Sequence, residues 1–359
     1  MLNKELIERA FYKMKKGKCN KRMVKYIAEN LSYNVDKMYD MLLNSRPNAE
    51  HLERGFQPRK HEPTKIIEHG KERIIYKPDI WEQWVHHIIM QVLSPILIGK
   101  FYTHSYGSIP KKGLHKCKDR AVILKKNYKW AFKLDIRHFF SNIRVNLMLD
   151  TLREFIKDEW FIYLIATCFK WHKKGLPLGF YLSQWLSNVY LNNLDYIICN
   201  HKGIEHVRYV DDIIMFGNNK RKLLICFDEI KQELGRLRLT VKDNYQLISC
   251  EKEPIDFLGF VITECGVRLR KNLKRRIFKV IKSIRRRRKE NKPIWIHHVR
   301  QILSYLGWIK HSDSYTLFEN NVIPYVRIDK FKQIVSKYER RCRNDEMGNG
   351  DFRSQPAYA

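Results

Sequence analysis

The sequence predicts an α+β protein in which an antiparallel sheet carries packed helices and a basic helical region follows it. Apolar, strand-like segments at 130–136 and 207–216 are separated by segments whose apolar residues recur at helical spacing. Beyond about residue 266 the chain becomes strongly basic, with helical periodicity. At 359 residues the chain is long enough for two or three packed subdomains.

The elements of the first half follow from apolar spacing and from turn residues. They are two short basic helices between 5 and 44 with a break at 17–20, a hairpin over 64–76 whose turn contains Gly70, a helix from Trp81 that Pro95 ends near Leu97, a strand over 130–136, and helical spacing over 145–171. The hairpin is expected to bring Lys65, Lys71 and Arg73 near one another.

The elements of the second half are read in the same way. They are a break at 175–179, a helix starting near Ser183, a strand–turn–strand over 207–216, a helix over 223–237, a strand pair at 239–241 and 246–249, an amphipathic helix over 273–289, and a helix from Pro293 to a cap at Gly307. A boundary is expected near Gly266, and the polar, Gly-rich segment 344–359 is expected to be disordered.

The charge of the chain points to a polyanionic partner. Lys and Arg number 69 against 38 Asp and Glu, a formal net charge of +31. Self-repulsion of that size is tolerated mainly by proteins that bind nucleic acid. A merely soluble basic protein is the alternative reading of the charge alone.

Cysteine spacing and hydropathy indicate in which compartment the protein is expected. None of the eight cysteines is spaced as CxxC or grouped with histidines, so zinc and a disulfide framework are not expected. The N-terminus carries charges where a signal peptide needs apolar residues. The longest uncharged run, 175–194, is interrupted by polar residues, so no membrane span is expected. These features predict a cytoplasmic protein with free thiols.

Three aspartates at strand ends are the candidate catalytic residues. Asp135 ends one apolar strand, and Asp211 and Asp212 lie at the tip of a predicted hairpin. Asp also suits tight turns, which is the structural alternative for the pair. If the three carboxylates converge on one sheet edge, their mutual repulsion favours bound cations. Two Mg²⁺ ions about 4 Å apart would then support nucleotidyl transfer.

The motifs and their order resemble reverse transcriptases. Tyr209-Val210-Asp211-Asp212 is similar to the YxDD signature of that family, and residues 135–140 are similar to its first palm motif. The resemblance covers roughly 65–260. It implies a right-hand polymerase with N-terminal helices and fingers at 1–128, a palm at 129–265 that returns through the fingers at about 145–176, and a basic helical thumb at 266–343.

The resemblance also implies roles for individual residues. Asp135 and Asp211 would bind two Mg²⁺ ions, for which Mn²⁺ can substitute, with the Ile136 carbonyl as a further ligand and Asp212 as an auxiliary carboxylate. Phe140 would exclude a ribose 2′-hydroxyl, so that deoxynucleoside triphosphates are preferred. The other implied contacts are Lys65, Arg73, Leu178, Gly179, Gln184 and Lys242 to the nucleotide, and Tyr209, Leu258, Gly259, Arg275, Arg276, Lys279 and Arg286 to nucleic acid. Phe139, by contrast, is expected to be core.

One motif differs from that of most reverse transcriptases and indicates a particular subgroup of the family. Most reverse transcriptases have Gln-Gly-x-x-x-Ser-Pro between the two aspartate motifs, whereas residues 178–184 read LGFYLSQ. Leu178 and Gln184 at the two ends resemble the reverse transcriptases of diversity-generating retroelements. That family implies misincorporation opposite template adenines, a retroelement template RNA with its RNA/DNA hybrid, and a small basic helical accessory protein. In the alternative, Leu178 only packs against a neighbouring strand.

Other functions remain open on the sequence. A group II intron-type enzyme shares the palm motifs, although such enzymes normally carry a longer C-terminal region. An antiphage-defence reverse transcriptase is another possibility. A polymerase-shaped RNA-binding protein without catalysis would keep the basic surface, but it could lose the carboxylates that this chain retains.

Overall fold

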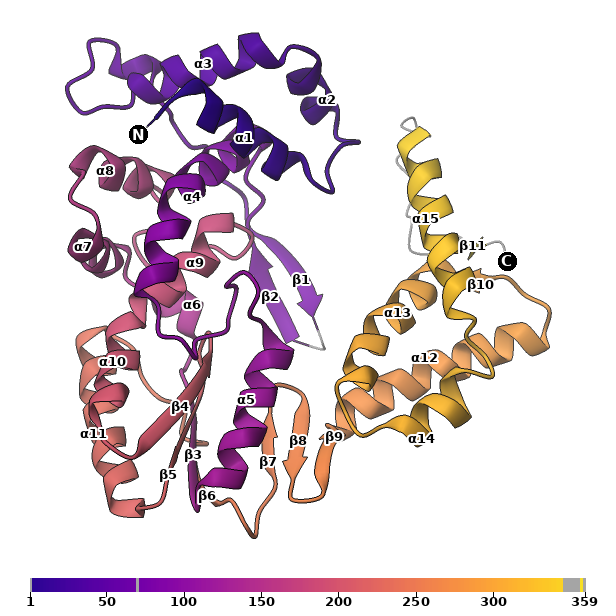
Figure 1. Ribbon diagram of the computed structural model, residues 1–359. Helices are drawn as coiled ribbons and strands as arrows, with labels where there is room; N and C mark the ends of the chain where they lie inside the picture. Colours follow the sequence, from indigo (N-terminus) through magenta and orange to yellow (C-terminus); the bar gives the residue numbers. More distant parts are fainter. Residues whose placement is uncertain (1, 69–70, 345–355, 358–359) are drawn as a thin grey trace. The chain divides into compact units, whose positions relative to one another are not determined.

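The computed structural model describes residues 2–68, 71–344 and 356–357, and the chain divides into two compact units, Met1–Leu247 and Ile248–Ala359 (Figure 1). The division falls within strand β6 (Gln246–Ser249), upstream of the boundary expected near Gly266. The reason is that a small sheet over residues 255–269 belongs to the second unit.

The N-terminal helices of the first unit are α1 (Lys4–Lys15), α2 (Arg22–Glu29) and α3 (Leu31–Leu43). Two helices were expected here; the second divides at Asn30, whose backbone leaves the helical region at φ −119° and ψ 44°. Helix α1 packs against α3 and α4 (Ile80–Lys100), where the indole nitrogen of Trp84 donates a 2.9 Å hydrogen bond to the Ile7 carbonyl.

Helix α4 does not end at Pro95, contrary to the sequence prediction. The helix continues to Lys100, and the amide of Phe101 still bonds the Leu97 carbonyl at 2.9 Å. Proline removes one helical hydrogen bond. Complete burial of Leu93 and Leu97 on either side of it offsets that loss.

The predicted hairpin is confirmed as β1 (Thr64–Glu68) paired with β2 (Lys71–Ile75). It follows a short 3₁₀ turn at Leu52–Arg54. The turn expected at Gly70 lies outside the described residues. Lys65 pairs its ammonium with Glu72 at 2.9 Å on this hairpin, and Arg73 lies opposite Ile66.

The central sheet is antiparallel, with the order β4-β5-β3-β6. Strands β3 (Trp130–Asp135), β4 (Ile204–Tyr209) and β5 (Asp212–Gly217) agree with the sequence prediction. The strand expected at 239–241 does not form. Val241 makes only a single bridge with Ile136, because β3 has already ended at Asp135.

Helices pack around this sheet. Helix α5 (Leu114–Asn127) packs against β4, and α10 (Asn192–Asn200) and α11 (Lys220–Arg236) pack against β4 and β5. The remaining helices of the first unit are α6 (Phe139–Asn142), α7 (Val145–Phe155), α8 (Glu159–Cys168) and α9 (Tyr181–Tyr190). The helical spacing over 145–171 thus corresponds to two helices, because Asp158 interrupts it and caps α8 by accepting from the Phe161 amide at 3.2 Å.

The second unit begins with the sheet β7 (Ile255–Phe257), β8 (Phe260–Thr263) and β9 (Gly266–Leu269). Its helical part contains α12 (Lys271–Lys289), α13 (Ile296–Lys310), α14 (Tyr315–Leu317), a π-helical turn (Phe318–Val322) and α15 (Ile328–Asn344), with short strands β10 (Ile294–Trp295) and β11 (Pro356–Ala357). The predicted amphipathic helix is confirmed, since Ile277, Val280, Ile281 and Ile284 on α12 are buried.

Helix α13 begins later and ends later than the sequence predicts. Pro293 precedes β10 rather than opening the helix, and Gly307 lies inside the helix. The helix continues because Ile309 is buried and the Trp308 ring packs over Gly259. Of the tail expected at 344–359, Asn344 ends α15 and 356–357 form β11; residues 345–355 and 358–359 lie outside the described part.

No helix in the described part of the chain is long and apolar enough to span a bilayer.

Candidate active site

The strand register brings the end of β3, the end of β4 and the start of β5 together at one end of the central sheet. Asp135 at the end of β3 lies directly opposite Asp212, the first residue of β5, and Tyr209 on β4 lies opposite the same residue. Paired residues in an antiparallel sheet point to the same face. Asp135 and Asp212 therefore share a face, with Asp211 in the two-residue turn beside them.

The turn itself has a constrained backbone. Val210 adopts φ +60°, a left-handed conformation that β-branched residues rarely take. Gly107 lies directly against it: a Cβ added at Gly107 would come within 2.8 Å of the Val210 nitrogen. Residues 104–107 also pair with β4, since the Tyr106 amide bonds the Arg208 carbonyl at 2.8 Å. The segment 104–107 therefore contacts both the turn and the end of the strand that leads into it.

Burial and mutual repulsion shape the electrostatics of the carboxylates. Burial raises the pKa of Asp211 to about 6, with a further contribution from Asp135, while Lys242 and Arg73 act in the opposite direction. Burial likewise raises the pKa of Asp212 to about 7, reinforced by Asp211 and Asp135. Their ionised forms lack sufficient counter-charge here, which is the condition in which a bound cation is favourable.

Asp135 contacts Lys242 through both its side chain and its backbone. The sequence predicted both residues for this site. The Lys242 ammonium pairs with Oδ2 of Asp135, and the Lys242 amide bonds the Asp135 carbonyl at 2.8 Å. Oδ1 of Asp135 is buried without a hydrogen-bond partner. The Arg137 amide bonds the Thr240 carbonyl at 2.8 Å, so this bridge does not use the carbonyl of Ile136.

The side chains do not form a closed metal cage in this arrangement. Within residues 2–68, 71–344 and 356–357, no three His, Cys, Asp or Glu side chains are positioned to hold a metal ion. One carboxylate oxygen of the trio is instead occupied by Lys242.

The segment from Leu178 to Gly179 lies against the end of the β1–β2 hairpin. The amide of Tyr76 donates a 2.7 Å hydrogen bond to the Leu178 carbonyl. Gly179 has φ +104°, and a Cβ there would lie 2.1 Å from the Tyr76 carbonyl oxygen. Only glycine fits so close an approach. Strand β2 also carries Arg73, so the hydrogen bond at Tyr76 joins the predicted nucleotide contacts Leu178 and Gly179 to the hairpin that carries the third.

The remaining predicted nucleotide contacts lie on nearby elements of the same unit. Gln184 is exposed on α9 and accepts from the Ser108 hydroxyl at 3.3 Å. Phe139 is buried, as expected for core, whereas Phe140 is half-buried on α6. Lys65 pairs with Glu72 rather than pointing to a defined site. The nucleotide roles of these residues stay predictions.

In the second unit, Leu258 and Gly259 form the two-residue turn between β7 and β8. Both have positive φ, 48° and 83°, as a type I′ hairpin turn requires. A Cβ at Gly259 would lie 2.7 Å from the Trp308 ring, so this glycine is explained by packing. Its predicted contact with nucleic acid remains untested, as does that of Leu258.

Some basic residues of α12 are open to solvent, and another packs within the second unit. Arg275, Lys279 and Arg286 are exposed, and Arg276 is half-buried. Arg287, by contrast, lies 4.3 Å over the Trp295 ring and therefore serves packing within the unit. The four residues predicted to contact nucleic acid are therefore the exposed or half-buried ones.

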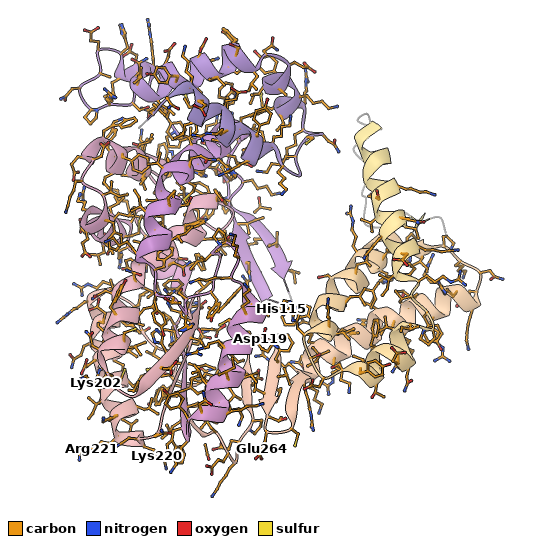
Figure 2. All side chains as sticks on the ribbon, viewed as in Figure 1. His115, Asp119, Lys202, Lys220, Arg221 and Glu264 are labelled. Carbon is orange, nitrogen blue, oxygen red and sulfur yellow. The ribbon has the colours of Figure 1, made fainter. Side chains whose placement is uncertain are left out.

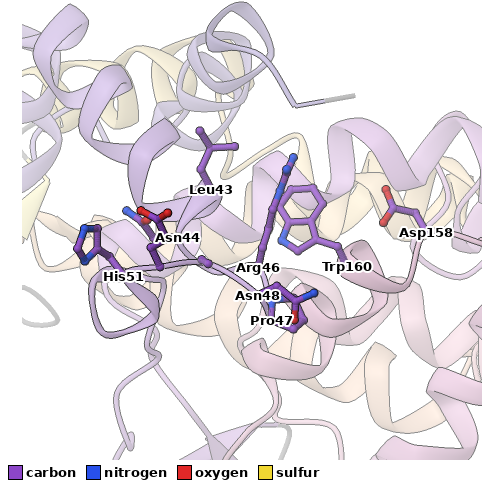
Figure 3. Close-up of a pocket in the computed structure, with 10 residues that line it drawn as sticks. Leu43, Asn44, Arg46, Pro47, Asn48, His51, Asp158 and Trp160 are labelled. Atoms are coloured by element: carbon purple, nitrogen blue, oxygen red, sulfur yellow. The ribbon is translucent and has the colours of Figure 1, made fainter.

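Other features of the first unit lie away from the aspartates. A hollow of about 730 Å³ is lined by the end of α3, the loop after it and the start of α8, with Arg46 beside Trp160 (Figure 3). None of the predicted site residues lines it. Lys202, Lys220 and Arg221 lie at the end of the β4–β5 hairpin opposite the turn (Figure 2). Neither feature joins the carboxylate site.

Sequence reasoning missed the residues beneath the turn. Arg208, Asp195 and Asn188 are fully buried and form a hydrogen-bonded network below Val210. An arginine inside an apolar strand, three residues before Asp211, was the available signal, because arginine is rarely buried without a partner.

Comparison with known families decides the relationship. Residues 59–262 match the family model described as "Reverse transcriptase (RNA-dependent DNA polymerase)". The chain belongs to the reverse transcriptase family. The antiparallel sheet with its packed helices, which lies within the matched range, is accordingly that of a right-hand polymerase.

The individual relatives are distant. The chain is 23% identical to the putative COX1/OXI3 intron 1 protein of Saccharomyces cerevisiae, over 77% of this chain and 41% of that protein. It is 30% identical to the uncharacterized 91 kDa protein in cob intron of Schizosaccharomyces pombe, over 34% of this chain and 16% of that protein. This chain therefore spans less than half the length of these relatives. Among solved structures, the apo telomerase of Candida tropicalis aligns with a TM-score of 0.49 and 15% identity, over 82% of this chain and 68% of that one.

Proposed function

We propose that this chain is an RNA-dependent DNA polymerase that copies a retroelement template RNA by two-metal nucleotidyl transfer and makes errors opposite template adenines. The observation that carries the proposal is the register that sets Asp135 opposite Asp212 with Asp211 in the adjoining turn. Three carboxylates at one sheet edge, in a chain of net charge +31, suit chemistry on nucleic acid.

The donor set fits divalent cations. Reverse transcriptase domains use such ions, and two Mg²⁺ would bind here, with Mn²⁺ able to substitute. Asp135 and Asp211 would hold them with the Ile136 carbonyl, and the buried, unpartnered Oδ1 of Asp135 is suited to a ligand. Bound ions would activate the attacking hydroxyl and stabilise the leaving pyrophosphate. For this, Asp135 must release Lys242, and the carboxylates must turn toward a common point.

The surrounding residues bind and orient the substrate. Arg73 on β2 would clamp the triphosphate, since a guanidinium can contact phosphate oxygens in a bidentate way. Lys242, once displaced from Asp135, would be placed to donate a proton to pyrophosphate. The half-buried Phe140 would close against a ribose 2′-hydroxyl and so select deoxynucleotides.

The error-prone subtype rests on Leu178. Its carbonyl is already bonded to the Tyr76 amide, so any contact of Leu178 with the nucleotide must come from its apolar side chain, where most reverse transcriptases carry a glutamine. Loss of one side-chain hydrogen bond is worth about 0.5–1.5 kcal/mol, a few-fold to tenfold in discrimination. The proposed partners are template RNA, its RNA/DNA hybrid and a small basic helical accessory protein. Two relatives carry the word intron in their names, which favours an intron-type enzyme of ordinary fidelity as the alternative.

Primer extension on an RNA template with Mg²⁺ tests the activity. Asp211→Asn removes one proposed metal ligand, which is worth about 3 kcal/mol or more, so extension should fall at least about 100-fold. Asp228→Asn, an exposed aspartate on α11 paired with Lys231, is the control and should match the wild type. Equal extension by all three proteins would refute the catalytic assignment. An inactive wild type that binds RNA tightly would indicate the non-catalytic alternative.

Sequencing of cDNA made from an adenine-rich RNA tests the subtype. Leu178→Gln should lower misincorporation at template adenines a few-fold to tenfold. Errors at template cytosines serve as the internal control and should change less. An unchanged error spectrum would support the intron-type alternative and the packing role of Leu178.

A further inference from the structure

The network beneath the turn begins with a completely buried arginine. Arg208 on β4 and Asp195 on α10 are both 0% exposed. The guanidinium contacts the carboxylate in a bidentate way, with Nε 2.9 Å from Oδ1, and Nη2 2.5 Å from Oδ2. His206 adds a 3.1 Å contact to Oδ1. Burial opposes ionisation, but Arg208 and His206 outweigh it and hold the pKa of Asp195 below its ordinary value. The pair is therefore charged.

The other side of the guanidinium reaches the catalytic turn. Nη1 of Arg208 donates to the carbonyl oxygen of Val210 at 3.1 Å and to Oδ1 of Asn188 at 2.9 Å. The Val210 carbonyl belongs to the peptide group whose nitrogen is that of Asp211. A hydrogen bond to that oxygen fixes the plane of the peptide, and hence the direction in which the Asp211 side chain leaves the backbone.

The same network holds the segment that packs against the turn. Asn188 on α9 donates from Nδ2 to the Gly107 carbonyl at 2.7 Å. The Arg208 amide bonds the His104 carbonyl at 3.1 Å. Val210 is held in its left-handed conformation between this segment and Arg208. A conformation that sparse persists only when its surroundings impose it.

We propose that Arg208 is a positioning residue for Asp211, acting through the Val210 carbonyl, and that Asp195 and Asn188 hold Arg208 in place for this purpose. The inference rests on the proposed metal-dependent activity of Asp211. It differs from a purely structural role, in which the ion pair would stabilise the fold and any well-packed replacement would serve the site equally.

The test replaces the ion pair by apolar residues of similar size. Removing one partner alone would leave a buried charge unpaired and unfold the region, whereas replacing both is often neutral in stability. The double variant Arg208→Met/Asp195→Leu therefore retains packing but lacks the donor to Val210. Its matched control is Arg120→Met/Glu205→Leu, which removes an arginine–carboxylate pair at the opposite end of the same strand β4.

Three measurements are made on the full chain: the thermal midpoint, kcat and KM for a deoxynucleotide in primer extension, and Mn²⁺ binding by electron paramagnetic resonance without substrate. The double variant should keep a midpoint close to wild type, lose at least about tenfold in kcat with KM within about twofold, and bind Mn²⁺ at least about tenfold more weakly. The control pair should leave kcat and Mn²⁺ affinity unchanged.

A folded double variant with wild-type kcat and Mn²⁺ affinity would overturn the proposal, as would equal losses in the control pair. If the wild type binds Mn²⁺ but does not extend a primer, the proposed function fails separately, and the Mn²⁺ affinities still decide the role of Arg208. If the double variant does not fold, Asn188→Ala decides instead. It keeps the ion pair and should lower kcat and Mn²⁺ affinity in the same direction, and wild-type values for it would refute the proposal.

Discussion

Substituting Gly179 by alanine tests the contact between the 177–179 segment and the hairpin. The new Cβ would lie 2.1 Å from the Tyr76 carbonyl oxygen, and ordinary van der Waals contact begins near 3.4 Å. The two segments must therefore separate by about 1.3 Å, from 2.1 to 3.4 Å. That movement breaks or weakens the 2.7 Å hydrogen bond from Tyr76 to Leu178.

The expected cost has two parts. A left-handed alanine costs about 1–2 kcal/mol, and loss of the hydrogen bond adds about 0.5–1.5 kcal/mol. Displacement of substrate-positioning residues by about 1 Å can lower kcat/KM by up to about 100-fold. Gly179→Ala should thus reduce both the thermal midpoint and kcat/KM for deoxynucleotides, with the larger relative effect on the kinetics.

Gly203→Ala is the matched control. Gly203 also has a left-handed φ, +84°, but a Cβ there meets nothing within 4 Å. It should carry the conformational cost alone, about 1–2 kcal/mol, and leave kcat/KM unchanged. If both variants have the same midpoint and the same kinetics, the close approach at Tyr76 does not shape the nucleotide site, and the reasoning is wrong.

Two further predictions concern sugar choice and the basic helix α12. Phe140→Ala should lower the preference for deoxynucleotides over ribonucleotides about 10–100-fold in competitive primer extension, because the ring proposed to exclude the 2′-hydroxyl is gone. The neighbouring Phe139→Ala should lose stability without a change in sugar choice, and an equal change in sugar choice in both variants would contradict the proposed role of Phe140. Arg275→Gln combined with Lys279→Gln should make the slope of log affinity for RNA/DNA hybrid against log salt shallower by about 0.7–0.9 per residue, whereas Lys202→Gln should not. An unchanged slope would remove α12 from the nucleic-acid surface.

The sequence could predict those parts of the site that depend on short, local patterns of residues. Strand β3 and the hairpin around Val210 and Asp211 were found because β-branched runs and a two-residue turn are local signals. Lys242 was placed by motif order, and its ion pair with Asp135 agrees with that placement.

What sequence could not predict depends on tertiary contacts. Pro95 should have ended α4, and Gly307 should have ended α13, but the burial of Leu97 and the packing of Trp308 extend both helices. The network of Arg208 with Asp195 joins residues from a strand and a helix whose contact no local pattern specifies. The ion pair of Lys242 with Asp135 likewise joins residues far apart in the sequence, and the order of the motifs does not give its geometry.

The pairing of β3 with β5 makes the candidate active site depend on strand length more than on strand composition. The two strands pair residue for residue from Trp130 opposite Gly217 at one end to Asp135 opposite Asp212 at the other. The position of each aspartate therefore depends on the number of residues in its strand. Apolar residues such as Ile213 or Met215 can be exchanged for others of similar volume at modest cost. One inserted or deleted residue in either strand would instead turn one aspartate to the opposite face of the sheet. Length changes in these two strands should therefore separate the carboxylates even where every functional residue is retained.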